Sequence, residues 1–173
     1  MRKWEPNAKN PKDPNIYTGL ENMLPTTSGS YRTARQFLDI SGATPPTVPI
    51  AADAFLQQDG TARFFTGTAT KLYEGVTFTD RSRGGASYTS GTYWHGAQYG
   101  DVTIYTNYAD NVQASSSGAF ADLAGTPPKA RYVVTQSLAV LLFNYNDGVN
   151  AYGDGWWASD IGSHTTWTPA AGN

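Results

Sequence analysis

Short runs of apolar and β-branched residues recur along the chain and are separated by Gly, Asn, Asp and Ser, a pattern typical of β-strands joined by turns. The predicted strands span residues 63–66, 70–73, 76–79, 102–106, 112–114, 131–134, 138–143 and 156–159. Turn signals lie at 81–85, 110–111 and 146–148, and the last of these contains the Asp-Gly dipeptide of tight hairpins. Helix is scarce, so the pattern predicts an all-β body.

The predicted strands recur at a regular interval. Leu72, Ile104 and Val140 each lie in a strand that has another strand before and after it, and they are 32 and 36 residues apart. Antiparallel sheets of three or four strands at this interval are typical of β-propeller blades, but an evenly spaced β-sandwich remains open as an alternative. Because propellers usually have about 4–8 blades, three blades would leave two faces bare. We therefore expect either a fragment or a ring that another chain completes.

The first 50 residues differ from the rest. Seven of the ten prolines precede Ile50, and proline at this density prevents continuous helix and favours extended backbone. One exception is residues 30–38, which could form two helical turns ended by Ser41-Gly42. The sequence therefore predicts an extended, proline-rich N-terminal arm over residues 1–50 and a β-rich, propeller-like body over residues 51–173.

The arm has two interpretations: a leader without a defined partner, or a segment that folds against a neighbouring subunit. Up to Ile50 the chain has six basic and four acidic residues, whereas the remainder has six basic and ten acidic. A basic arm beside an acidic body suits docking in a repeating assembly, and apolar anchors are rare in a pure linker. The candidate interaction residues of the arm are Tyr17, Asn22, Met23, Leu24, Pro25, Tyr31, Arg32 and Phe37.

Composition excludes several classes of protein. Of the 173 residues, 15% are charged and 13% are aromatic, which argues against intrinsic disorder and against a coiled coil. The absence of cysteine excludes disulfides, thiolate zinc sites and cysteine nucleophiles. The longest apolar run, residues 138–143, is too short to span a bilayer, and no apolar signal-peptide segment follows the N-terminus. A net charge of −2 makes general nucleic-acid binding an unfavoured role.

Few residues suit catalysis. His95 is expected to be half-buried in a strand and His164 to lie in a solvated loop, and no nucleophile elbow, phosphate-binding loop or metal-binding motif is present. Carboxylates that could form a glycosidase pair, but that are favoured as turn residues, are Asp80, Asp101, Asp110, Asp147, Asp154 and Asp160. The sequence therefore predicts a protein that is not an enzyme and has no metal or cofactor.

The aromatic residues allow another function. Sugar-stacking platforms or packing between sheets are both open to Trp94, Trp156, Trp157, Trp167, Tyr99, Tyr105 and Tyr108, and packing is favoured. Trp156 and Trp157 must point to opposite faces if they lie in a strand, so at most one of them could belong to a given platform.

Three ordered sets of motifs carry a family resemblance along nearly the whole chain. The first is LENMLP at 20–25 with GSYR at 29–32. The second is YGDV at 99–102, FADLAG at 120–125 and PPKAR at 127–131, and the third is WASDIG at 157–162 with TWTP at 166–169. Together they resemble the N-terminal part of the tail nozzle proteins of short-tailed bacteriophages, also called packaged-DNA stabilisation proteins.

The resemblance implies a β-propeller subunit of the virion tail, assembled in the host cytoplasm as a ring, usually a hexamer, around the DNA exit channel. The implied partners are other copies of the chain, a tail adaptor or portal-proximal protein, and genomic DNA in transit, with no membrane. The implied function is to retain the packaged genome and conduct it during ejection. Members of this family are generally longer than this chain. The alternatives are a carbohydrate- or receptor-binding β module and a propeller glycosidase fragment.

Overall fold

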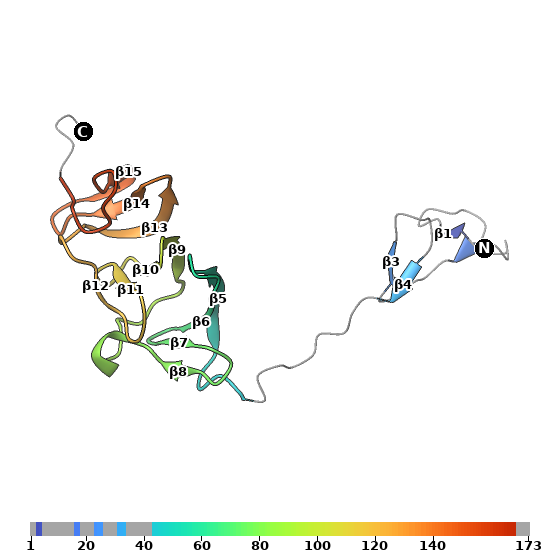
Figure 1. Ribbon diagram of the computed structural model, residues 1–173. Helices are drawn as coiled ribbons and strands as arrows, with labels where there is room; N and C mark the ends of the chain where they lie inside the picture. Colours follow the sequence, from blue (N-terminus) through green and yellow to red (C-terminus); the bar gives the residue numbers. More distant parts are fainter. Residues whose placement is uncertain (1–2, 5–15, 18–22, 26–30, 34–42, 169–173) are drawn as a thin grey trace. The chain divides into compact units, whose positions relative to one another are not determined.

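The computed structural model describes residues 3–4, 16–17, 23–25, 31–33 and 43–168, and these are almost entirely β-strand and turn (Figure 1). The chain divides into one unit over Met1–Asp39 and another over Ile40–Asn173. In the first unit, the strands are β1 (Lys3–Trp4), β2 (Ile16–Tyr17), β3 (Met23–Pro25) and β4 (Tyr31–Thr33). β1 pairs with β2 in parallel, and β3 pairs with β4 antiparallel.

The second unit, which we call the body, consists of three antiparallel meanders. The first sheet contains β5 (Pro49–Leu56), β6 (Ala62–Thr68), β7 (Leu72–Glu74) and β8 (Thr79–Asp80). The middle sheet contains β9 (His95–Tyr99), β10 (Val102–Thr106), β11 (Gln113–Ser115) and β12 (Ala121–Asp122). The last sheet contains β13 (Lys129–Gln136), β14 (Ala139–Asn146) and β15 (Ala151–Ala158). A single 3₁₀ turn, η1 (Arg83–Gly85), joins the first sheet to the middle one. The predicted all-β body with sheets of three or four strands is confirmed.

Some local predictions are wrong. Residues 76–79 were expected to form a strand, but residues 75–78 form a turn because Gly75 and Phe78 adopt positive φ angles of 74° and 52°. The helical turns expected over residues 30–38 are wrong at Tyr31–Thr33, whose backbone pairs with β3. β5 was not predicted, and it begins at Pro49, inside the segment assigned to the arm.

The three sheets stack in sequence order, with the middle sheet between two cores. Along β10, Ile104 contributes to the core against the last sheet, and the next residue, Tyr105, contributes to the core against the first sheet. This division follows from strand geometry, because successive side chains point to opposite faces. The core toward the last sheet contains Ala97, Ile104, Val112, Leu123, Ala130, Val133, Val140, Leu142 and Tyr145. The core toward the first sheet contains Phe65, Leu72, Tyr88, Trp94, Tyr105 and Phe120.

The first strands of the three sheets are neighbours. β9 contacts both β13 and β5, so the three meanders approach one another along their initial strands. The expected equivalence of Leu72, Ile104 and Val140 needs a correction, because Leu72 lies in the third strand of its sheet whereas the other two lie in the second. All three residues are fully buried.

A glycine is required where β9 passes the aromatic core. A Cβ added to Gly96 would lie 2.7 Å from Tyr105 Cε1 and 2.8 Å from Phe55 Cζ. Gly96→Ala is therefore expected to lower the free energy of unfolding by about 1–3 kcal/mol, because both rings must move. Gly153→Ala is the control, since no atom lies within 4 Å of its added Cβ. Equal effects of the two substitutions in urea unfolding would contradict this account.

Candidate functional site

The outer face of the first sheet, turned away from the middle sheet, is apolar. Ala54 pairs with Phe64 across β5 and β6, and Leu56 lies two residues further along the same face. Phe64 is 52% exposed and Leu56 is 66% exposed. With the turn residues Val76 and Phe78, Ala54 and Phe64 line a shallow hollow of about 350 Å³. Aromatic and aliphatic side chains of this size are usually buried, so this surface is suited to contact with another apolar surface.

The outer face of the last sheet is apolar as well. Tyr132, Phe143 and Trp156 form one row across its three strands. A second row on the same face consists of Val134, Leu141 and Ala158. Trp156 is 47% exposed, whereas Trp157 packs against the core on the opposite face, so the prediction that these two side chains point apart is confirmed.

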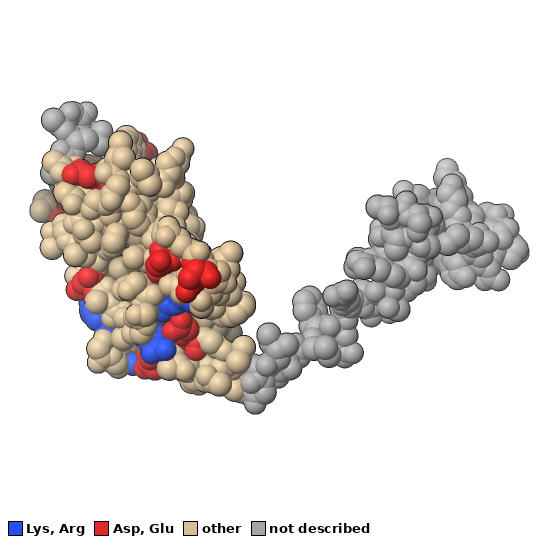
Figure 2. Space-filling model, viewed as in Figure 1, with Lys and Arg blue, Asp and Glu red and all other residues tan. Residues whose placement is uncertain are grey.

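Charged side chains are unevenly distributed over the body. In Figure 2, Lys and Arg are interspersed with Asp and Glu over the lower half, and most of the upper half in that view is uncharged. The ion pairs between described residues are Arg63–Glu74, Arg81–Glu74, Lys71–Asp80 and Arg83–Asp122. All four join residues of the first and middle sheets or of the turn between them. None of these four ion pairs involves the last sheet, where the Arg131 guanidinium instead lies over the ring of Tyr132 on the apolar outer face, 5.8 Å from its centroid.

The arm residues predicted to mediate interactions are described only in part. Tyr17, Met23, Leu24, Pro25, Tyr31 and Arg32 lie in β-strands by their backbone. Asn22 and Phe37 lie outside the described residues. The role of these eight residues in docking stays a prediction.

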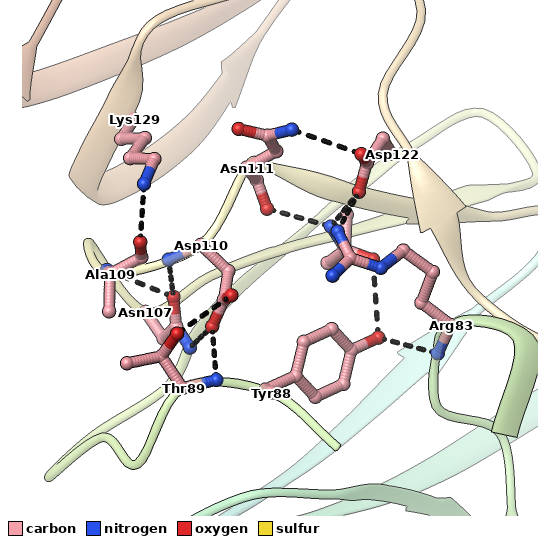
Figure 3. A network of polar contacts seen from close by, with 10 residues as sticks. Arg83, Tyr88, Thr89, Asn107, Ala109, Asp110, Asn111, Asp122 and Lys129 are labelled. Carbon is pink, nitrogen blue, oxygen red and sulfur yellow. Dashed lines mark hydrogen bonds and ion pairs between the residues drawn. The ribbon is translucent and has the colours of Figure 1, made fainter. Parts of the chain in front are cut away.

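A polar network joins η1 and the loop after it to the middle sheet, and the middle sheet to the last sheet (Figure 3). Asp122 is at its centre and accepts hydrogen bonds from Arg83 Nη1 at 2.6 Å, Gln113 Nε2 at 2.7 Å and Asn111 Nδ2 at 3.0 Å. The Tyr88 hydroxyl accepts a bond from the Arg83 backbone N–H and donates to Gln113 Oε1.

A second carboxylate in Figure 3 has a similar role. Asp110 accepts bonds from the N–H and hydroxyl groups of Thr89 and from Asn107 Nδ2. Lys129, in the last sheet, donates to the carbonyl oxygen of Ala109 at 2.6 Å. The donors and acceptors of this network therefore satisfy one another across the sheets.

The ionisation of the network indicates a structural role. Burial alone would raise the pKa of Asp122, but bonds from Gln113, Arg83 and Asn111 outweigh it and lower the pKa below its ordinary value. Burial raises the pKa of Tyr88 to about 12. Asp122 therefore stays ionised and Tyr88 stays neutral near pH 7, whereas an acid or base catalyst needs a pKa near the working pH.

Beside the network is a hollow of about 510 Å³, which Asp122, Lys129, Asn146, Asp147 and Trp157 help to line. Two of its polar side chains have local partners, whereas Trp157 Nε1 is buried and has no hydrogen-bond partner among the described residues. Asn146 Oδ1 accepts a bond from the Gly148 N–H, and Asp147 Oδ1 accepts bonds from the N–H groups of Val149 and Asn150. The prediction of a turn role for Asp147 is confirmed.

The remaining candidate residues are placed as follows. Trp94 cannot form a sugar platform, because it is buried between the first and middle sheets and its Nε1 donates to the Thr68 carbonyl at 2.8 Å. His95 is half-buried in β9, as predicted, and its ring packs against Tyr132. His164 lies in a loop most of whose residues are exposed, as predicted, and its own side chain is half-buried with its ring against Tyr99.

Within the described part of the chain, no three His, Asp or Glu side chains are grouped so that they could hold a metal ion. The same residues include no helix of the length and apolar character needed to cross a membrane.

No family model matches the chain, and a search of curated proteins found no match.

Proposed function

We propose that the protein is a structural component of a short-tailed phage tail, in which propeller-like blades from several copies form a ring around the DNA channel. In this role it has no chemical step to perform. It helps to retain the packaged genome and to conduct it during ejection.

The observation that carries this proposal is the pair of apolar outer faces on the first and last sheets. Three consecutive meanders that approach one another along their first strands support a propeller-like interpretation, in which each blade would cover its neighbour's apolar face. Here the first sheet presents Phe64 and the last presents Trp156, both about half exposed. Two different faces at opposite ends of one stack favour head-to-tail association, which gives a ring when the rotation between successive copies closes.

The assignment to a phage tail rests on the motif resemblance. Charge is compatible with it, since the part of the chain after Ile50 has six basic and ten acidic residues. Lys and Arg contacts to phosphates dominate the affinity of proteins for DNA. A channel wall with few unpaired cations would let DNA pass without holding it.

Self-association through the two faces tests the proposal. The full chain is expected to sediment as an oligomer at micromolar concentration. Phe64→Glu and Trp156→Glu should each shift it to monomer, because a buried unpaired carboxylate opposes docking. Val149→Glu is the control, since Val149 is exposed in the β14–β15 turn, away from both faces. A wild-type chain that sediments as a stable monomer would contradict the proposal, and averaged electron micrographs would give the symmetry of the ring.

A second function, binding of a carbohydrate or receptor, is favoured by one observation. Trp156 and Tyr152 are exposed beside a hollow of about 700 Å³ in the last sheet, and ligand sites commonly have volumes of about 300–1,000 Å³. Glycan binding by a monomeric chain that Trp156→Ala abolishes would support this function over ring formation.

A further inference from the structure

Among the described residues, the last sheet has one strand fewer than its two neighbours. The first and middle sheets have four strands each, whereas the last has three, in the order β13-β14-β15. β15 is eight residues long, and no described strand pairs with the edge that faces away from β14. A long edge strand presents unpaired backbone N–H and C=O groups, which can pair with an additional strand.

A hollow of about 700 Å³ follows this edge. Trp156 and Trp157, which lie on opposite faces of the sheet, both line it, so the hollow extends around the edge of β15 itself. Tyr152, Ala158 and Ile161 supply further apolar surface. The edge therefore offers backbone hydrogen bonds together with apolar contacts, which is what a strand needs in order to bind by addition to a sheet.

The charges around the edge are negative. Asp154 is an exposed residue within β15, and Asp147 and Asp160 line the hollow. None of the three forms an ion pair with another described residue. Like charges opposed across a strand pair are destabilising and opposite charges are stabilising. These carboxylates therefore favour a basic strand and disfavour the pairing of two β15 strands.

We propose that residues 31–37 of a second copy add to the free edge of β15 as its fourth strand. Their sequence, Tyr-Arg-Thr-Ala-Arg-Gln-Phe, has no proline, has two arginines to meet the carboxylates, and has an aromatic residue at each end. Tyr31–Thr33 is extended in β4, so its backbone already has the required conformation. This inference rests on the proposed function, because it specifies how one copy in the ring contacts the next.

The added strand comes from a second copy of the chain because the two ends of the stack are different sheets, the first sheet at one end and the last sheet at the other. The body begins at β5 in the first sheet, and β15 is in the last sheet, on the other side of the middle sheet. In head-to-tail association, the first sheet of the next copy follows the last sheet of this one. The arm of that next copy, which precedes β5 in the sequence, is then the arm that reaches β15.

Charge reversal on either partner tests the inference in the full chain. The edge variant, Asp154→Lys, and the arm variant, Arg32→Glu with Arg35→Glu, should each weaken self-association at least about tenfold in sedimentation equilibrium. Asp59→Lys is the matched control, because Asp59 is an exposed carboxylate in the β5–β6 turn of the first sheet, and it should leave association unchanged. Thermal unfolding by circular dichroism identifies any variant that fails to fold, and Asp154→Asn then replaces it for the edge.

Mixing the variants identifies the occupant. The edge variant retains an intact arm and the arm variant retains an intact edge, and the reversed charges at the other contact are complementary as well. An equimolar mixture should therefore recover association, in oligomers that contain both variants. Failure of the mixture to associate more strongly than either variant alone would overturn the inference. If the arm variant associates as strongly as the wild type, residues 31–37 do not bind the edge of β15. The occupant of that edge would then be a second β15 or the residues after Thr168, and the inference would be overturned. If both variants associate normally but Phe64→Glu does not, the ring proposal stands and this inference fails. A wild-type monomer would overturn both.

Discussion

Tyr105→Ala is expected to lower the free energy of unfolding of the body by about 3–5 kcal/mol, as is typical when a buried aromatic side chain is truncated. Tyr105 is 1% exposed and lies at the centre of the core between the first and middle sheets. Its ring contacts the rings of Phe55, Phe65, Trp94 and Phe120, with centroids 5.7–6.2 Å apart. Removal of the ring would leave a cavity that four rigid aromatic groups cannot readily fill.

Two further variants test this prediction, one by removing the hydroxyl group alone and the other by truncating a more exposed tyrosine. Tyr105→Phe removes only the hydroxyl, which donates to Asp53 Oδ2 at 2.8 Å, and should cost about 1 kcal/mol. Tyr152→Ala, at a partly exposed position where the ring stacks on Tyr145 with centroids 4.7 Å apart, should lower the free energy of unfolding by about 0.5–1.5 kcal/mol. Urea unfolding monitored by tryptophan fluorescence measures all three. If Tyr105→Ala were no more destabilising than Tyr152→Ala, the core would not be centred on Tyr105.

Glu74→Ala is expected to lower the free energy of unfolding of the body by about 3 kcal/mol. The substitution leaves two arginines without the carboxylate that they share. Glu74 Oε1 lies 2.6 Å from Arg63 Nε, and Glu74 Oε2 lies 2.7 Å from Arg81 Nε. Arg63 is only 5% exposed and also donates to Ser115 in β11, so the triad links the first sheet to the middle one. An uncompensated buried charge is among the most destabilising changes in a protein.

The same triad gives a pH dependence. Burial alone would raise the pKa of Glu74, but the hydrogen bonds and charges of Arg63 and Arg81 outweigh it, so its pKa lies below the ordinary value of 4.5. A carboxyl whose pKa is lowered by folding stabilises the folded state above its ordinary pKa, and this stabilisation is lost as the pH falls through the folded pKa. The difference in the free energy of unfolding between the wild type and Glu74→Gln should therefore be largest above pH 4.5 and become smaller in more acidic solution.

The control for the triad is the more exposed pair of Lys71 and Asp80, with Nζ and Oδ2 3.0 Å apart. Asp80→Asn should cost at most about 1 kcal/mol, since solvent-exposed pairs contribute little. A Glu74 variant that is no less stable than Asp80→Asn at pH 7 would show that the triad does not stabilise the body.

Strands that combine strong local propensity with clear turns could be predicted from the sequence. Val102–Thr106 was predicted with the bounds of β10, because β-branched and aromatic residues there lie between two turns. β5 was missed because Ala51, Ala52 and Ala54 have little strand propensity. Its conformation depends on pairing with β6 and on Phe55, which packs against the core. Such tertiary contacts are not visible in local sequence.

The candidate surfaces were predictable only in outline. The repeat number indicated two bare faces, but not which residues would form them. Alternation along 62–68 separates buried Phe65 from exposed Phe64, a signal that becomes useful only when the strand bounds are known. The polar network could not be foreseen, because Arg83 and Asp122 are 39 residues apart in the sequence. The burial of Trp94 could not be predicted either, since a tryptophan in or beside a strand can face either a core or solvent.

The position of the middle sheet between two cores affects how the body can change in evolution. Ile104 and Tyr105 are adjacent in β10 but belong to separate cores, so each core is formed by the middle sheet and one outer sheet. A duplication or loss of a whole meander at either end would alter one core and leave the other complete. The middle meander cannot be lost in this way, because both cores would go with it. The chain is therefore extensible at its ends and constrained at its centre.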